Sequence, residues 1–244
     1  HEIKYINRRI SPKIRDIVDH FPVTVLTGAR QVGKSTLLRH EFPDFTYYTL
    51  DDYAVLEQAK LDPHSLWSGN DRLIIDEAQK LPALFDAIKL AVDSSERRKK
   101  FILSGSANLL LMKSITESLA GRALYVELGP MTWGELKGVA EPVHFNRLWD
   151  PEFHESEQIL ESFDPLPLLQ RGFMPSLVPL TGHRDVLNWL EGYVRTYLER
   201  DLRELSQVDS LIDFRRLMRS LALRTGGVLN QADVAKDKIG RAHV

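Results

Sequence analysis

FPVTVLTGARQVGKSTLL, at residues 21–38, is the most informative stretch of this 244-residue chain. Residues 23–26 form a short apolar run rich in β-branched side chains, which predicts a buried strand. A glycine-containing loop follows at residues 28–33, and residues 35–40 have the composition of a helix. A strand, a loop and a helix in this order are the context in which phosphate-binding loops occur.

Residues 28–35, GARQVGKS, fit the pattern G-x-x-x-x-G-K-[ST] of a phosphate-binding loop. Gly28 and Gly33 allow backbone angles and a close approach that a side chain would block. Successive N–H groups then form a nest for an anion, and the helix N-terminus adds partial positive charge. Lys34 would reach the β- and γ-phosphates, and the Ser35 hydroxyl would ligate Mg²⁺. The alternative is a glycine-rich turn that precedes a helix by chance.

The predicted nucleotide site therefore includes every residue of this loop. Its members are Gly28, Ala29, Arg30, Gln31, Val32, Gly33, Lys34 and Ser35. Arg30 is in addition a candidate for contact with a phosphate or a base.

Two acids, Asp76 and Glu77, directly follow an apolar strand predicted at residues 73–75. In a protein with a phosphate-binding loop, an aspartate at such a strand end holds Mg²⁺, and we expect Asp76 to do so through water. Glu77 would orient or deprotonate an attacking water molecule. The alternative is that one of these acids only caps a helix.

Two further positions are candidates for the same site. Residues 104–108, SGSAN, follow a strand predicted at 101–103, and Ser106, or after it Ser104, would contact the γ-phosphate or the water. A serine-rich turn is the alternative. Arg122 precedes a strand predicted at 124–126 and would stabilise transition-state charge, on its own nucleotide or on that of a neighbouring subunit. The alternative is a surface arginine.

Strands alternate with helices through the first half of the chain. The expected strands are 23–26, 45–50, 73–75, 101–103 and 124–126, with helices at 11–20, 35–40, around 54–59 and after Pro82. This alternation predicts parallel pairing with helices on both faces of a sheet. The predicted fold class is α/β: a P-loop NTPase three-layer sandwich with a mostly parallel five-stranded sheet, followed by a helical carboxyl-terminal domain.

Composition changes mark three regions. Residues 1–140 form the predicted P-loop domain, and residues 141–183, rich in proline and carboxylates, form a linker with a stiff break at 164–167, DPLP. Residues 184–244 form the predicted helical domain, with two helices up to about residue 224 and a third capped by Asn230. The final DKIGRAHV leads us to expect that this domain is truncated.

Composition excludes several classes of protein. The net charge is -2, so the chain as a whole does not bind polyanions, although Arg215, Arg216 and Arg219 leave a local DNA contact open. The absence of cysteine excludes disulfides, thiolate zinc sites and a cysteine nucleophile. No apolar run approaches the roughly 20 residues of a membrane helix, so we expect a cytoplasmic protein without a membrane partner.

Four segments together resemble the AAA-type ATPase domain of a bacterial and archaeal family of predicted AAA+ ATPases. They are FPVTVLTGARQVGKSTLL, TLDD, LIIDEAQKLPALFDAIK and FILSGSANLLL followed by LAGR. RGFMPSL and the stretch that begins NWLEGYVRTYLERDL look like the start of the domain of unknown function that forms the family's second half. The resemblance covers about residues 8–236.

The resemblance implies that ATP and Mg²⁺ bind at residues 28–35 with Thr36, and at Asp76 and Glu77. It also implies a strand inserted between the P-loop strand and the acidic strand, Ser106 near a sensor position, and Arg122 as a candidate arginine finger. In the family the second domain continues into what resembles a winged helix, a pattern that residues 237–244 do not continue.

The sequence thus predicts an ATP-binding, Mg²⁺-dependent ATP-hydrolysing switch protein, with the P-loop lysine among its catalytic residues and with self-association into a homo-oligomer left open. A rival hypothesis is a DNA- or protein-binding module in which ATP is a structural or regulatory ligand. A second rival is a P-loop kinase, although the acid pair after the strand favours water activation.

Overall fold

A computed structural model of the chain describes residues 5–105, 118–138, 164–198 and 210–239. The chain divides into two compact units, residues 1–180 and residues 181–244. The predicted helical domain begins at residue 184, three residues after the start of the second unit.

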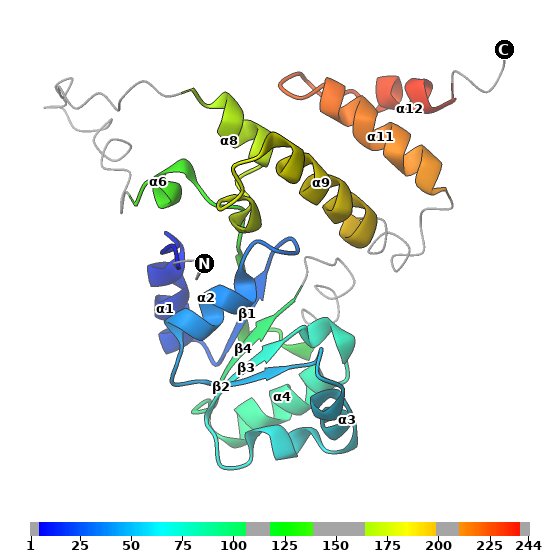
Figure 1. Ribbon diagram of the computed structural model, residues 1–244. Helices are drawn as coiled ribbons and strands as arrows, with labels where there is room; N and C mark the ends of the chain where they lie inside the picture. Colours follow the sequence, from blue (N-terminus) through cyan, green and yellow to red (C-terminus); the bar gives the residue numbers. More distant parts are fainter. Residues whose placement is uncertain (1–4, 106–117, 139–163, 199–209, 240–244) are drawn as a thin grey trace, which may run out of the picture. The chain divides into compact units, whose positions relative to one another are not determined.

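The first unit contains a five-stranded sheet (Figure 1). Its strands are β1 (Val23–Thr27), β2 (Thr46–Thr49), β3 (Arg72–Asp76), β4 (Lys100–Ser104) and β5 (Ala123–Glu127). Their order is β2-β3-β4-β1-β5, and all four pairings are parallel. The prediction of a five-stranded parallel sheet is confirmed, and so is the insertion of one strand, β4, between the P-loop strand and the acidic strand.

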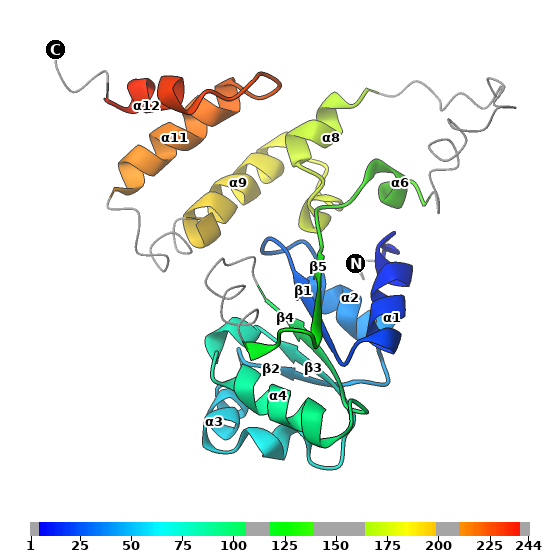
Figure 2. The same ribbon diagram turned by 180° about the vertical axis from the view of Figure 1, so that it is seen from behind.

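Helices cover both faces of this sheet, as the two opposite views show (Figures 1 and 2). Helices α1 (Ser11–His20) and α2 (Lys34–Glu41) lie on one face, and α3 (Tyr53–Leu61) and α4 (Leu84–Ser94) lie on the other. Short 3-10 turns, η1 (Pro63–Trp67) and η2 (Ala78–Lys80), follow α3 and β3. The three-layer sandwich is therefore confirmed.

Alternation along the strands divides the core between the two faces. Val23, Val25 and their register partners on β4 join α4 in one cluster of buried side chains. The intervening residues point to the α1 and α2 face and are also fully buried: Thr24, Leu26, Ile74 and Ile102. Burial on both faces explains why these strands read as continuous apolar runs rather than as alternating ones.

Part of the region predicted to be a linker is built into the first unit. After α6 (Trp133–Leu136), the described chain resumes with α8 (Leu166–Arg171) and a 3-10 turn η3 (Pro175–Leu177), in which Leu177 is fully buried. Helix α8 begins within residues 164–167, where the sequence predicted a stiff break, because a proline is well tolerated in the first turn of a helix.

The second unit is helical, as predicted. It contains α9 (His183–Tyr193), which continues as a π-helical segment (Val194–Leu198), then α11 (Leu211–Leu223) and α12 (Gln231–Ile239). The predicted cap is present, since the Asn230 side chain accepts a 2.9 Å hydrogen bond from the Ala232 N–H. Within the described parts of the chain, no helix is both long enough and apolar enough to cross a membrane.

Glu41, at the end of α2, ties that helix to α1. Its carboxylate accepts hydrogen bonds from Ser11 at 3.1 Å and Tyr5 at 3.2 Å, and it forms an ion pair with Arg15. Burial opposes ionisation of this group, but the donors outweigh it and hold the pKa of Glu41 below its usual value. The charged form of Glu41 is therefore the form that joins the two helices.

Replacing Glu41 by glutamine should lower the free energy of unfolding by about 1–3 kcal/mol at pH 7, because charge-assisted hydrogen bonds are lost. A depressed carboxyl pKa stabilises the fold above the unfolded value of 4.5, and this contribution disappears as the pH falls through the folded value. Urea unfolding at pH 7 and pH 3 should show the difference between parent and Glu41→Gln shrinking at the lower pH.

Glu57→Gln is the matched control, because Glu57 pairs with its exposed neighbour Lys60 and should change stability by less than about 0.5 kcal/mol. A Glu41→Gln difference of equal size at both pH values would contradict the assigned role of its charge.

Candidate active site

The loop between β1 and α2 has a backbone that only glycine allows at one end. Gly28 has φ +147°, and a Cβ placed on it would lie 2.3 Å from the Leu128 carbonyl oxygen. Gly33, with φ +95°, also has a left-handed backbone where α2 begins. Both glycines of the motif are therefore needed for the loop conformation. Both adopt φ angles that other residues rarely adopt, and Gly28 also packs too closely against Leu128 to carry a side chain.

Arg8 holds this loop from behind. Its buried guanidinium donates to the Val32 carbonyl at 2.8 Å and the Gly129 carbonyl at 2.7 Å, and it pairs with the buried carboxylate of Glu135 at 3.3 Å. In a trans peptide the carbonyl and the next N–H point in opposite directions. Arg8 therefore turns the Gly33 N–H away from itself. Sequence reasoning missed Arg8, which no loop motif includes.

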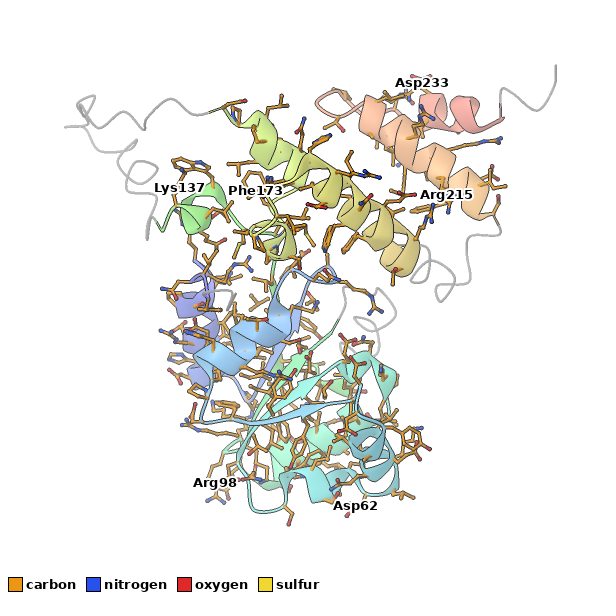
Figure 3. All side chains as sticks on the ribbon, in the orientation of Figure 1. Asp62, Arg98, Lys137, Phe173, Arg215 and Asp233 are labelled. Atoms are coloured by element: carbon orange, nitrogen blue, oxygen red, sulfur yellow. The ribbon has the colours of Figure 1, made fainter. Side chains whose placement is uncertain are left out.

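The segment around η3 also lies against the loop. The Ser176 hydroxyl donates to the Gln31 side chain at 3.2 Å, and Pro175 lies 3.8 Å from the position of a Cβ added to Gly33. Phe173, labelled in Figure 3, accepts a 2.9 Å backbone hydrogen bond from Met131. This segment falls within the predicted linker, and sequence reasoning gave it no role.

Lys34 is buried, and its ammonium group donates to the carbonyls of Gly28 at 2.9 Å and Ala29 at 3.0 Å. It therefore folds back over its own loop. Arg30 is half-buried and Thr36 is exposed. All the predicted loop residues lie in the described part of the chain, between β1 and the first turn of α2.

The carboxylate of Asp76 receives four hydrogen bonds. One oxygen accepts from Ser35, at 2.5 Å, and from Tyr47; the other accepts from Ser104 and from the Glu77 N–H, at 3.1 Å. Asp76 is 4% exposed, and this burial opposes ionisation, yet the four donors together hold its pKa below the usual value. The structure thus joins the loop helix, through Ser35, to the acidic strand.

Strand register explains why Tyr47 and Ser104 meet this aspartate. Tyr47 pairs with Ile74, two residues before Asp76, so the Tyr47 and Asp76 side chains share a face of the sheet. Ser104 ends β4, the strand beside β3. Burial and the hydrogen bond to Asp76 raise the pKa of Tyr47 to about 12, so Tyr47 acts as a donor. Nothing in the sequence predicted Tyr47, because the register of β2 was unknown.

These residues fit Mg²⁺. Within the described ranges, no three acidic or histidine side chains form a cluster that could hold a metal ion by themselves. Mg²⁺ is usually bound through one or two carboxylates together with phosphate and water rather than by an all-protein cage. A hydroxyl that donates its proton to a buried carboxylate, as Ser35 does to Asp76, keeps its oxygen lone pairs for a cation.

Glu77 follows Asp76 at the same edge of the sheet and has a left-handed backbone, with φ +56°. One of its carboxylate oxygens accepts a hydrogen bond from the Gln79 side chain. Ser106 lies outside the described residues. Ser104, the second candidate for contact with the γ-phosphate or the water, donates its hydroxyl hydrogen bond to Asp76.

Arg122 lies at the amino-terminal end of the parallel strands, whereas the loop lies at their carboxyl-terminal end. It precedes β5, and its carbonyl accepts a 3.2 Å hydrogen bond from Val23, the first residue of β1. A five-residue strand, about 16 Å long, therefore separates it from the loop. Its side chain donates to both carboxylate oxygens of Asp93, at 2.7 and 2.8 Å. The structure does not bring Arg122 together with the loop of its own chain, and its role on either nucleotide stays a prediction.

Two family models match the chain. Residues 20–137 match an AAA domain, and residues 166–243 match a domain of unknown function, DUF8612. The resemblance inferred from the motifs is thereby confirmed: an AAA-type ATPase domain is joined to a carboxyl-terminal domain of unknown function.

Relatives extend this match over nearly the whole chain. Two proteins named as uncharacterized, Rv2008c of Mycobacterium tuberculosis and Mb2031c of Mycobacterium bovis, are each 32% identical over 248 residues, covering 97% of this chain and 51% of theirs. The chain therefore spans about half the length of these relatives. The Walker-type ATPase PABY2304 of Pyrococcus abyssi has a similar fold, with a TM-score of 0.52 and 19% identity over 97% of this chain and 90% of its own.

Replacing Gly28 by alanine should weaken nucleotide binding by about 100-fold, because the added Cβ collides with the Leu128 carbonyl and displaces the loop. Titration with a fluorescent ATP analogue would measure this. Gly129→Ala is the control, since a Cβ there meets no atom within 4 Å. Equal affinities for parent and Gly28→Ala would contradict the assignment of this loop as the phosphate site.

Proposed function

We propose that this chain binds ATP with Mg²⁺ and hydrolyses it. The observation that carries the proposal is the 2.5 Å hydrogen bond between Ser35 and Asp76. It links the helix that follows the phosphate-binding loop to β3. The residue after this strand, Glu77, carries a carboxylate that can serve as a general base. The AAA domain match and the ATPase fold support nucleotide binding, and the arrangement of these side chains supports hydrolysis.

Each residue would have a distinct task. The loop N–H groups and the N-terminus of α2 would bind the phosphates. Lys34 would exchange its bonds to the Gly28 and Ala29 carbonyls for the β- and γ-phosphate oxygens. Ser35 directly, and Asp76 through water, would hold Mg²⁺, which when bound neutralises charge on the phosphate oxygens.

Glu77 would act as the general base. It would take a proton from the water whose oxygen attacks the γ-phosphorus, while the bond from that phosphorus to the bridging oxygen of ADP breaks. A general base of this kind contributes about 10²–10⁴-fold to the rate.

The loop would also signal its nucleotide state to the rest of the chain. Gln31 accepts a hydrogen bond from Ser176 in the segment Pro175–Leu177, and three residues separate this segment from the start of the second unit. A movement of the loop on phosphate binding would therefore act on the chain segment that leads into the helical unit. This supports a switch in which nucleotide state is passed from the AAA domain to the carboxyl-terminal domain.

The partner of that switch remains a proposal. DNA or protein binding by the helical unit and self-association are both open, and a cytoplasmic location stays a prediction. Two of the exposed arginines of the helical unit, Arg195 and Arg216, pair with Glu191 and Asp213, which favours a solvated, salt-bridged surface over a nucleic-acid interface there.

Glu77→Gln should lower the turnover number for ATP by at least about 100-fold while leaving ATP affinity within a fewfold of the parent, because only the base is removed. Phosphate release with Mg²⁺ and no added acceptor would measure hydrolysis. Lys34→Ala should abolish binding itself. A parent that binds ATP tightly without turnover would instead favour the rival in which ATP is a structural or regulatory ligand.

Ser176→Ala should weaken the connection between the loop and η3. In the parent, an ATP analogue should slow hydrogen exchange of the backbone amides of residues 174–180, and the variant should show less than half of this change. Its ATP affinity should fall by no more than about tenfold, since one neutral hydrogen bond is lost. Ser65→Ala is the control, because Ser65 bonds within η1 and α3. Unchanged slowing in Ser176→Ala would rule out this route.

A further inference from the structure

Gln79 holds the carboxylate that the proposed reaction needs. Its Nε2 donates to Oε2 of Glu77. An ionised carboxylate can only accept hydrogen bonds, so the nitrogen end of the amide must face it, and this fixes the orientation of the amide. The other end of the amide, Oε1, is buried and has no hydrogen-bond partner among the described residues. The amide nitrogen of Gln79 thus has a partner in Glu77, while the amide oxygen is left without one.

The backbone brings these two side chains together. Residues two apart on an α-helix do not face each other. Here Glu77 has a left-handed backbone and caps η2, whose first turn is closed by a 3.0 Å bond from the Lys80 N–H to the Glu77 carbonyl. The Lys80 side chain pairs with Asp51, which fixes the far end of the turn. The contact between Gln79 and Glu77 is therefore a product of this particular turn.

Two features of this arrangement are unfavourable. A left-handed backbone is uncommon for a residue other than glycine, and a buried amide oxygen without a partner has lost its water without replacement. Unfavourable features of this kind concentrate at sites that change state. Rotation of Gln79 away from Glu77 would free its oxygen to bond water.

We propose that Gln79 is a latch on Glu77, which withholds one oxygen of the general base from the attacking water until the Gln79 amide moves away. The inference rests on the proposed function, because it assigns a regulator to the base of that reaction. Gln79 is a positioning residue that acts through Glu77. In the latched state the Glu77 carboxylate has one oxygen occupied and its orientation fixed, and in the released state both oxygens can turn toward water.

Gln79→Met tests the latch, because methionine keeps the length of the side chain and removes the donor. Phosphate release should show kcat rising by about tenfold to a hundredfold, the rate equivalent of losing one hydrogen bond to a charged group. The KM for ATP should stay within about twofold, and the melting temperature should be unchanged or higher, since the unpaired buried oxygen is gone. Gln58→Met is the control and should leave kcat unchanged, because Gln58 lies on α3 and donates its side-chain hydrogen bond to Ser65 in η1.

A fall in kcat, or no change, in a folded Gln79→Met protein would overturn the latch. A lower melting temperature would indicate a structural role, and Gln79→Leu, which also removes the donor and adds no charge beside Glu77, then carries the test with the same expected rise.

The double variant Glu77→Gln with Gln79→Met separates this inference from the proposed function. It should be no more active than Glu77→Gln alone, because the latch acts through Glu77; a gain that persists there would overturn the latch. Failure of the proposed function has a different signature, namely a parent that releases no phosphate.

Discussion

The buried carboxylate of Asp76 is the group on which the rest of the site depends. Its four donors come from three other positions in the fold and from the next residue: Ser35 at the start of α2, Tyr47 on β2, Ser104 on β4, and the Glu77 N–H. An ionised carboxylate away from water is tolerated only when its oxygens are fully paired. The interaction that joins these elements is therefore the same one that places the Ser35 end of the loop beside the acidic strand.

A second constraint acts on the loop from its other side. The carbonyl of Val32 is bonded to Arg8, and Gly28 is packed against the Leu128 carbonyl, so segments more than a hundred residues apart fix the loop's shape. A buried arginine–glutamate pair is costly to desolvate and is a weak source of stability by itself. Arg8 and Glu135 gain from further partners, since Arg8 also bonds carbonyls and Glu135 also caps α6. Pre-organisation of the loop is the benefit that this pair supplies.

The parts of the fold that could be predicted from the sequence are those set by local pattern. The apolar strands, the loop and the acids after β3 follow from periodicity and from a motif whose chemistry needs those residue types. Tyr47 and Arg8 could not be found, because their roles depend on strand register and on contacts between distant segments. The separation of Arg122 from its own loop could be predicted, since a residue before a parallel strand lies at the opposite end of the strands from the loops that follow them. Whether it serves a neighbouring subunit depends on an assembly that sequence pattern does not encode.

The division of the chain by sequence differs from its division by packing. The domain of unknown function begins at residue 166, whereas the second compact unit begins at residue 181. Residues 166–180 thus belong to the second domain in sequence and to the AAA unit in structure, where Leu177 is fully buried and Ser176 reaches Gln31. The phosphate-binding loop is therefore completed by residues of the second domain. A change in the loop on nucleotide binding would alter its contacts with this segment, and this is the physical basis of the proposed coupling between the nucleotide site and the carboxyl-terminal domain.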